Sequence, residues 1–339
     1  MDQESKPAKA PNIRDVARLA GVSYQTVSRV LNGSSAIRAE TRARVEAAIA
    51  ELDYKPNVAA RALASKRSNT IGVLIATHVA SYGVHTMVLA IGNAANEHGM
   101  HITITSCGSD PESVYEALER LTAQAVDGVI VVAPQVRVFD ALAAQPRTMP
   151  VIALDSSQHA TVTNVAVDQR AGARLAVRHL IALGHKDILH IAGPQDWIEA
   201  ELRMQGYLDE LLEHDLPVIP PILGDWTSDF GYRALTELIS RRDFTAIFVA
   251  NDQMAMGVLH GLHDVGVRVP HDMSVASFDD NPESAHTIPP LTSVRQDFRR
   301  VGHEAVERLI AELAGAEPGG VLLVEPTLTI RASTAPPSR

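Results

Sequence analysis

Apolar residues recur at helical spacing three times within the first 56 residues, and each run is bounded by residues that begin or end helices. Asn12 can cap the first run, and Gly21 breaks the chain after it. Ser23 can cap the second run, and the third follows Arg38. The pattern therefore predicts three short helices, which cover residues 13–20, 24–31 and 39–52.

From Thr70 onward, short apolar runs alternate with amphipathic stretches, which predicts βαβ units and parallel sheets covered on both faces. About 260 residues exceed one comfortable core, so we expect two lobes with a crossing at residues 166–168. The predicted strands are Ile71–Ala76, His101–Cys107, Gly128–Val132, Val151–Leu154, Ile188–Ala192, Ala246–Ala250 and Ser274–Phe278. The predicted helices are His85–His98, Glu112–Gln124, Gln169–Leu183, Ala200–Glu213, Phe230–Ser240 and Met254–Val265.

Two short helices joined by a tight turn and followed by a third helix are typical of a helix-turn-helix unit. Its second helix enters the major groove of DNA, and the first residues of that helix meet base edges. Glutamine can pair with adenine and arginine with guanine, each through two hydrogen bonds. The alternative is a three-helix bundle whose polar face is only solvated. The candidate DNA contacts are Ser23, Tyr24, Gln25, Thr26 and Arg29.

The charge distribution favours the DNA-binding interpretation. The chain carries a net charge of −10, which taken alone argues against a nucleic-acid partner. Residues 1–70, however, hold 12 Lys and Arg against 7 Asp and Glu, a net +5, so the remainder carries −15. A basic head on an acidic body is expected of a module that docks on phosphate while its partner domain does not.

Residues 57–64 lie between the head and the body. They have high helix propensity, but a helix of eight residues is marginal alone. Pro56 argues against the alternative that they extend the third helix. We expect this hinge to be disordered in the free protein and to fold when two copies meet on DNA.

Polar residues directly follow three of the predicted strands. In parallel sheets, ligands bind in the crevice beyond the carboxyl ends of the strands. Asp155, Asn251 and Asp279 stand at such ends, whereas we expect Asp252 to be a helix cap. Their convergence predicts a binding cleft in the body.

The two tryptophans of the chain, Trp197 and Trp226, both fall in predicted loops of the body. An indole face ringed by carboxylates and amides suits a sugar, which has apolar C–H faces and a rim of hydroxyl groups. Arg203 could donate to adjacent hydroxyls. The alternative is a pair of tryptophans that merely anchor loops.

Several classes of protein are disfavoured. The absence of about 18 consecutive apolar residues argues against a membrane partner, and the N-terminus has no signal-peptide pattern, so we expect a cytoplasmic protein. Cys107 is the only cysteine, and His260 and His263 share a helical face without a third ligand, so no metal is expected. We find no Walker or dinucleotide glycine motif and expect neither an enzyme nor a cofactor. A solute-binding transport component would need an export signal and would not carry the head.

Residues 13–32, IRDVARLAGVSYQTVSRVLN, closely resemble the N-terminal signature of the LacI/GalR family of transcription regulators. The likeness continues through residues 41–57 and recurs in the body at 179–194, 202–207, 224–226, 250–257, 278–280 and 289–298. It implies a helix-turn-helix head at 1–56, a hinge helix and linker at 57–69, and a two-lobed body at 70–335 resembling periplasmic binding proteins. Lobe one would comprise about 70–167 and 295–325, and lobe two about 168–294 and 326–335.

The resemblance also implies a function and the residues that perform it. We expect a homodimeric repressor on a pseudo-palindromic operator in double-stranded DNA, released by a small sugar in the cleft between the lobes. Bases would be contacted by Tyr24, Gln25 and Arg29, phosphates by Ser23, Thr26 and Asn32, and the minor groove by Leu63, with Asn57 and Ala60 also facing DNA. Effector contacts would come from Asp155, Arg203, Trp226, Asn251, Asp279, Gln296 and Phe298, whereas Trp197 is proposed from its position alone.

The chain departs from the family's lactose-responsive members at two cleft positions. Val132 stands where they carry asparagine, and Val167 stands where they carry a phenylalanine. Both departures argue against the galactoside effector of those lactose-responsive members. No leucine-heptad tail precedes Arg339, so a dimer is expected rather than a tetramer. The open alternatives are a family member that responds to a purine or a phosphoprotein, or one whose effector acts as a corepressor.

Overall fold

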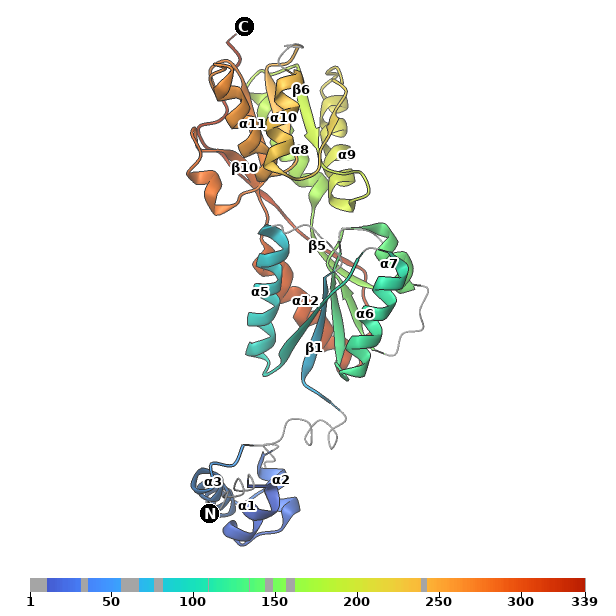
Figure 1. Cartoon of the computed structure of the whole chain (residues 1–339), viewed down its shortest axis with the longest axis vertical. Coiled ribbons are helices and arrows are strands. Elements are labelled where there is room, and N and C mark those ends of the chain that lie inside the picture. Colours follow the sequence, from blue (N-terminus) through green and yellow to red (C-terminus); the bar gives the residue numbers. More distant parts are fainter. Residues whose placement is uncertain are drawn as a thin grey trace, which may run out of the picture. The chain divides into compact units, whose positions relative to one another are not determined.

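The structure is a computed structural model that describes residues 11–31, 36–55, 67–75, 82–108, 110–133, 135–143, 149–156, 162–238 and 243–338. The chain divides into two compact units, Met1–Ser68 and Asn69–Arg339, each of which is described by itself (Figure 1). The first unit is helical, and the second contains two sheets. The predicted fold class, a three-helix head with a two-lobed α/β body, is confirmed.

The limits of the head helices follow their capping residues. The side-chain oxygen of Asn12 accepts a hydrogen bond from the Arg14 amide at 2.9 Å, and the Asp15 carboxylate accepts one from the Asn12 amide at 3.0 Å. Two amides that the first turn would leave unpaired are thereby satisfied. Gly21 ends the first helix with a positive φ of 62°. The helices are α1 (Ile13–Ala20), α2 (Tyr24–Leu31) and α3 (Ala39–Glu51).

The head has its own small hydrophobic core. Val16, Val27 and Val45, one from each helix, have no exposed surface. Tyr54, just after α3, is 9% exposed and packs against the same cluster. The helices α1 and α3 therefore fix the orientation of α2 by burying one of its faces.

Lobe one of the second unit is a six-stranded, fully parallel sheet in the order β11-β5-β4-β3-β1-β2. Its strands are β1 (Thr70–Ile75), β2 (His101–Ser106), β3 (Gly128–Val132), β4 (Val151–Ala153), β5 (Thr163–Val167) and β11 (Val321–Val324). The helices α5 (Tyr82–Glu97) and α12 (Phe298–Leu313) cover one face, and α6 (Pro111–Ala123) and α7 (Val136–Ala143) cover the other.

Lobe two repeats this architecture in the order β12-β10-β9-β8-β6-β7, with β12 antiparallel to β10. Its strands are β6 (Ile188–Ala192), β7 (Ile222–Leu223), β8 (Ala246–Val249), β9 (Ser274–Asp279), β10 (Thr292–Arg295) and β12 (Thr327–Thr329). The helices α8 (Gln169–Ala182) and α9 (Ile198–Glu213) pack on one face, and α10 (Ser228–Leu238) and α11 (Asp252–Asp264) on the other. A 3₁₀ helix, Pro282–Ala285, follows β9.

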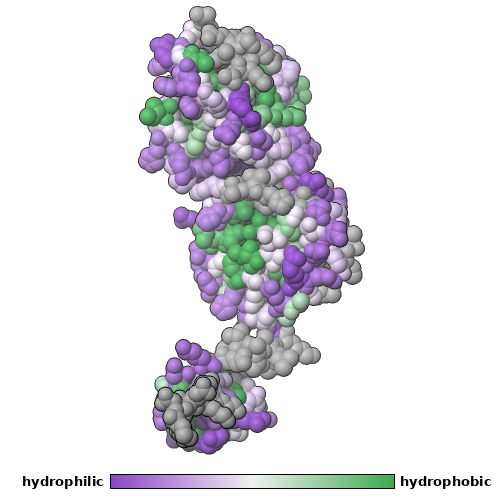
Figure 2. All heavy atoms as spheres, in the orientation of Figure 1, coloured by the Kyte–Doolittle hydropathy of each residue, from purple (hydrophilic) through white to green (hydrophobic). Residues whose placement is uncertain are grey.

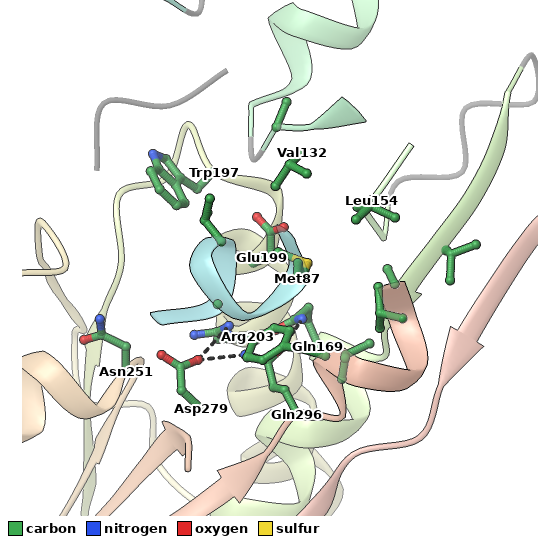
Figure 3. A pocket seen from close by; sticks show the side chains of 18 of the residues that line it. Met87, Val132, Leu154, Gln169, Trp197, Glu199, Arg203, Asn251, Asp279 and Gln296 are labelled. Atoms are coloured by element: carbon green, nitrogen blue, oxygen red, sulfur yellow. Dashed lines mark hydrogen bonds and ion pairs between the residues drawn. The ribbon is translucent and has the colours of Figure 1, made fainter. Parts of the chain in front are cut away.

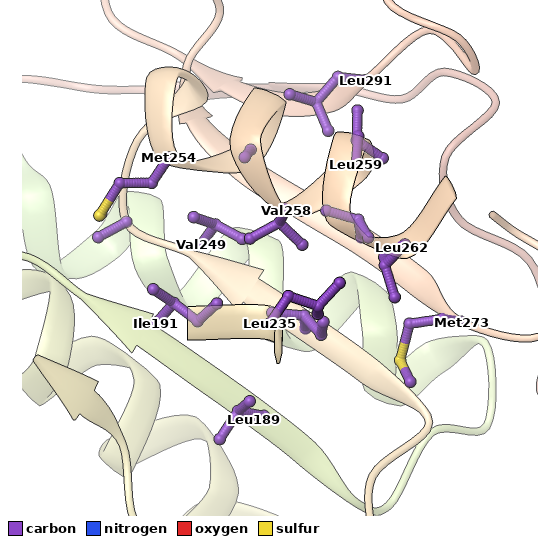
Figure 4. Packing of buried hydrophobic residues seen from close by; sticks show 14 of the residues in the cluster. Leu189, Ile191, Leu235, Val249, Met254, Val258, Leu259, Leu262, Met273 and Leu291 are labelled. Carbon is purple, nitrogen blue, oxygen red and sulfur yellow. The ribbon is translucent and has the colours of Figure 1, made fainter. Parts of the chain in front are cut away.

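Aliphatic side chains pack α11 against the sheet of lobe two. Ile191 and Val249 project from the sheet toward Val258 and Leu262 of α11 (Figure 4). All four side chains are at most 2% exposed. Burying each contributes about 1.5–3 kcal/mol, which holds the strand ends of this lobe in fixed positions.

Three segments of the described chain pass between the lobes: β5 to α8, β10 to α12, and β11 to β12. Two of the segments end in a capped helix. The Asp168 side chain accepts from the Ala171 amide at 2.8 Å, and the Asp297 side chain accepts from the Arg300 amide at 3.0 Å. The residues beside these caps are therefore held at the boundary between the lobes.

The seven predicted strands and six predicted helices of the body are all present, with ends shifted by up to three residues. The strands β5, β7, β10, β11 and β12 and the helices α7 and α12 were not predicted. Thr163 and Asn164 in β5 and Thr292 and Ser293 in β10 are polar although buried, so these strands lack the apolar run that marks the others. Within the described ranges, no helix is both long and apolar enough to cross a membrane.

Candidate functional site

The exposed face of α2 carries the predicted base contacts. The Ser23 hydroxyl accepts a hydrogen bond from the Thr26 amide at 3.2 Å and lies 2.9 Å from the Thr26 hydroxyl, so the predicted cap of α2 is confirmed. Tyr24, Gln25 and Arg29 point away from the head core and are exposed, Tyr24 to 50%. The side chains that could meet base edges are thus free to do so. Their role as DNA contacts stays a prediction.

Four other predicted DNA contacts lie outside the described residues. They are Asn32, Asn57, Ala60 and Leu63.

A cavity lies between the two lobes of the second unit and encloses about 790 Å³ of space, part of it open to solvent. Lobe one lines it with apolar residues only: Gly83, Val84, Met87, Val132, Ala133, Leu154, Val165, Ala166, Val167, Phe298 and Val301. Lobe two and its crossing segments line it with Gln169, Trp197, Glu199, Arg203, Trp226, Asn251, Asp279 and Gln296.

Four polar side chains form a closed ring on the lobe-two wall (Figure 3). Arg203 Nε donates to Gln169 Oε1 at 2.9 Å, and Gln169 Nε2 donates to Gln296 Oε1 at 2.8 Å. Gln296 Nε2 donates to Asp279 Oδ1 at 2.7 Å, and that oxygen lies 3.5 Å from Arg203 Nη2. Because Gln169 and Gln296 stand beside two of the lobe crossings, the ring joins lobe two to its connecting segments.

Arg203 is the centre of this ring and is 5% exposed. It projects from α9, and its Nη1 also donates to the carbonyl oxygen of Ala250 at the end of β8. Its guanidinium carbon lies 3.9 Å from the centroid of the Phe278 ring, a cation–π contact. One side chain therefore links the helix α9 with the carboxyl ends of β8 and β9.

The two tryptophans meet at the cavity, with ring centroids 5.4 Å apart at an interplanar angle of 58°. A Cβ atom on Gly193 would lie 2.2 Å from the Trp226 ring, so a glycine is required for this indole to pack against the backbone. Trp226 and Asp279 have φ angles of 72° and 107°, which side chains disfavour. Such strain concentrates at functional sites.

Lobe one and lobe two also touch at the mouth of the cavity. Gln135 and Trp197 form an isolated antiparallel backbone bridge, and Arg137 Nη2 lies 3.2 Å from the Asp196 carboxylate. Trp197 is therefore tied to lobe one by its backbone while its ring lines the cavity.

Burial dominates the electrostatics of the cavity. It raises the pKa of Asp279 to about 7, although the Arg203 charge acts in the opposite direction. Burial likewise lowers the pKa of Arg203 more than Asp279 and Glu199 raise it. The pKa of each partner is thus shifted in the direction opposite to the shift that the ion pair alone would cause. Arginine still remains charged, because its ordinary pKa lies far above neutrality.

Seven of the eight predicted effector residues line the cavity. Asp155 does not; it is 1% exposed, and its charge contributes to raising the pKa of the cavity residue Glu199. The role of all eight as effector contacts stays a prediction. The seven are Trp197, Arg203, Trp226, Asn251, Asp279, Gln296 and Phe298.

The interpretation of Asp252 as a helix cap is wrong, because Asn251 caps α11. The Asn251 Oδ1 accepts from the Met254 amide at 2.9 Å, and its Nδ2 donates to the Trp226 carbonyl at 3.2 Å. Asp252 is instead fully buried and accepts from the Ser284 and Ser293 hydroxyls at 2.6 and 2.7 Å. Asp252 therefore organises the segment after β9.

Sequence reasoning missed Gln169, Glu199 and Met87. Gln169 follows β5 after one residue, so the rule of strand ends would have found it had β5 been predicted. Glu199 lies in the first turn of α9, and Met87 on α5 is an apolar helix residue. No sequence signal separates those two from ordinary helix positions.

The comparisons with known proteins agree with this architecture. Residues 12–57 match the family model of bacterial regulatory proteins of the lacI family, and residues 177–334 match a periplasmic binding protein-like domain. The chain is 37% identical over 334 residues to the lactose operon repressor of Escherichia coli, covering 97% of this chain and 92% of that protein. The chain belongs to the LacI family of bacterial regulatory proteins.

Other relatives of the LacI family are also similar over nearly the whole chain. The chain is 36% identical to the regulator CelR of Thermobifida fusca, covering 96% of this chain and 98% of CelR. It is 31% identical to the repressor PurR of Haemophilus influenzae, covering 95% and 98%. These relatives are transcriptional regulators rather than enzymes, and this chain is a LacI-family transcriptional repressor.

Two solved structures of the family superpose over nearly the whole chain. The lac repressor dimer bound to operator and the anti-inducer ONPF gives a TM-score of 0.88 at 37% identity, covering 96% of this chain and all of that one. The CelR–cellobiose complex gives 0.71 at 32% identity, covering 95% and 99%. The resemblance found in the sequence is confirmed.

Proposed function

We propose that the chain acts as a homodimeric repressor on a pseudo-palindromic operator and is released by a small sugar bound between the lobes. The observation that carries the proposal is the lobe-two wall of the cavity. Its ring of Arg203, Gln169, Gln296 and Asp279 stands beside the indoles of Trp197 and Trp226. Polar groups beside flat apolar faces suit a ring with a hydroxyl rim.

The relatives support both a saccharide and a purine. A solved structure of CelR contains cellobiose, whereas PurR is named for repression related to purines. We favour the sugar because the polar groups of the cavity lie on one wall and converge from α8, α9, β9 and the segment after β10. A purine is an outcome that the ligand screen below would reveal.

Repression would follow from the exposed face of α2. Tyr24, Gln25 and Arg29 would contact base edges, while Ser23 and Thr26 would contact phosphates. Two heads on one dimer would occupy successive half-sites of the operator. Because effector closes the cleft between the lobes, it would separate the hinges and weaken operator binding, a coupling of typically about 1–3 kcal/mol.

An exposed apolar surface on lobe one supports the dimer. Leu89 on α5 is 56% exposed and Ile104 on the edge strand β2 is 50% exposed. Figure 2 shows hydrophobic residues gathered over this part of lobe one. A second copy would cover this surface, as the structure of the lac repressor dimer suggests by likeness. Leu89→Asp should yield a monomer in analytical ultracentrifugation, whereas Leu212→Asp, at a 77% exposed site on α9, should not.

A thermal-shift screen of the full chain against mono- and disaccharides and purine bases tests the effector. A ligand at 100 times its Kd adds about 2.7 kcal/mol to the free energy of unfolding. Stabilisation by a saccharide is the expected result. Stabilisation by a purine base alone would replace the sugar in this proposal.

Gel retardation on inverted-repeat duplexes tests the DNA half. We expect retardation in low salt, reversed by the saccharide found in the screen. Gln25→Ala should relax the base preference at one operator position by about 1–3 kcal/mol. Failure to retard any such duplex would refute the DNA-binding mode.

A further inference from the structure

Two buried polar atoms of cavity-lining residues have no hydrogen-bond partner within the described part of the chain. They are Oε2 of Glu199 and Nε1 of Trp226. The ring of Arg203, Gln169 and Gln296 with Asp279, in contrast, satisfies its members internally. Buried polar groups in native proteins are almost always paired, so an unpaired one that borders a cavity indicates a ligand.

Glu199 stands in the first turn of α9, four residues before Arg203, so both side chains lie on the same face of the helix. Figure 3 shows its carboxyl group apart from the polar ring and pointing into the cavity. The opposite wall at this place consists of lobe-one residues such as Met87 and Val132. A ligand between the lobes would therefore find at Oε2 of Glu199 a polar atom that has no hydrogen-bond partner among the described residues.

The charges that act on this carboxyl group are mostly negative. Asp155 and Asp279 both disfavour its ionisation, whereas the Arg203 charge and a hydrogen bond from the Glu199 backbone N–H favour it. Burial is the largest cause, and with the two aspartates it raises the pKa of Glu199 to about 7. The Nε, Nη1 and Nη2 atoms of Arg203 already face Gln169, the Ala250 carbonyl and Asp279. An anionic group in the cavity would thus meet the carboxyl groups of Glu199 and Asp279 and an arginine that is already paired.

We propose that Glu199 is an effector contact that binds a hydroxyl group of an uncharged sugar and excludes phosphorylated and carboxylated sugars. A hydroxyl group donates to a carboxylate and accepts from a carboxylic acid, so it pairs with Glu199 in either protonation state. Another hydroxyl can accept from the unpaired indole N–H of Trp226. This inference rests on the proposed sugar effector and adds the charge class of that sugar.

The experiment compares matched neutral and anionic sugars by isothermal titration calorimetry on the full chain. The probes are glucose with glucose 6-phosphate and glucuronate, galactose with galactose 6-phosphate and galacturonate, and cellobiose and lactose with their aldonates. We expect at least one neutral sugar to bind, and its anionic counterparts to bind about 100-fold more weakly or not at all, since an unpaired buried charge is costly.

Glu199→Gln should weaken the neutral sugar about tenfold and narrow the discrimination against the anionic counterpart, because a charge-capable partner is replaced by a neutral amide. Glu201→Gln is the matched control. Glu201 is exposed on the same helix, its carboxylate accepts only at the surface from Gln205 at 3.1 Å, and it does not line the cavity. Its substitution should leave both affinities unchanged.

Three results would overturn the inference. Equal affinities of Glu199→Gln and wild type, with unchanged discrimination, would remove Glu199 from the site while leaving the sugar effector intact. Preference of the wild type for a phosphorylated or acidic sugar would contradict the proposed uncharged class of effector. That result uses wild-type protein alone and does not depend on whether a variant folds. Binding of no saccharide would instead refute the proposed sugar effector, and this inference with it.

Discussion

The two lobes of the body share one architecture but contribute opposite chemistry to the cavity. Both are six-stranded sheets in corresponding strand order, with a pair of helices on each face. Every cavity residue of lobe one is apolar, whereas lobe two and its crossing segments supply all of the polar groups and both indoles. The difference teaches that a duplicated fold fixes where a ligand lies but not which groups meet it.

This division suggests separate tasks for the two lobes. Lobe two, with Arg203 hydrogen-bonded in its ring, would orient the ligand. Lobe one, with Met87 and Val132, would exclude water as the cleft closes. Polar contacts are stronger in a cavity from which water is excluded, so each lobe would depend on the other for affinity.

The largest effect is expected when Arg203 is removed from the centre of the polar lobe-two wall of the cavity. Arg203→Ala leaves Asp279 buried without its cationic partner, which should lower the free energy of unfolding by about 3–5 kcal/mol. Effector affinity should fall more than about 100-fold, giving a repressor that inducer no longer releases. Calorimetry measures the stability and the effector affinity, and a reporter assay measures induction. Arg268→Ala, at an exposed ion pair, is the control. Normal induction of the Arg203 variant would show that lobe two does not hold the ligand.

A smaller effect is expected when the apolar wall receives a polar group. Val132→Thr keeps the volume of a side chain that is 2% exposed but adds a hydroxyl group. An unpaired hydroxyl costs about 1–3 kcal/mol, so effector affinity should fall about tenfold. Val132→Ala separates this polarity from lost volume. Unchanged affinity in Val132→Thr would mean that lobe one does not require an apolar surface here.

The polar wall should also make stability depend on pH. Glu199 and Asp279 have a pKa of about 7 in the folded chain, above their unfolded values of about 4. The folded state therefore binds more protons between these values, and the free energy of unfolding should fall as the pH rises from about 5 to 8. In urea denaturation, the free energy of unfolding of Glu199→Gln should fall less steeply with rising pH than that of the wild type. An identical pH profile in the two proteins would contradict the raised pKa of Glu199.

The smallest effect is expected from removing the head. The cavity is lined entirely by residues after Thr70, so a chain truncated before that residue should bind effector with unchanged affinity. This truncation also tests the predicted domain division. A cooperative thermal melt is the expected result, and a product that is unfolded in that melt would reject the division.

The unequal chemistry of the lobes explains how much of the site the sequence could predict. Asn251 and Asp279 lie at the carboxyl ends of apolar strands and were found by the rule of strand ends. Gln169 was missed because β5, which precedes it, begins with the buried polar residues Thr163 and Asn164. The fold was predicted more completely than the site, because most strands bury apolar runs on both faces.

The apolar wall could not be predicted at all from the pattern of residues. Val132 ends a strand of five consecutive buried residues, and Met87 shares its helix with core residues such as Ile91. An apolar side chain at a cavity and one in a core have the same helical or strand periodicity. Only the spatial arrangement of the lobes separates the two.

The positions of the two indoles give the molecule an intrinsic optical reporter. Trp197 and Trp226 are the only tryptophans of the chain, and both border the same cavity. Fluorescence excited selectively from tryptophan therefore originates entirely at the cleft. Its emission maximum and intensity should respond to ligand occupancy there. Because the head has no such fluorophore, events at α2 would change this signal only by altering the cleft.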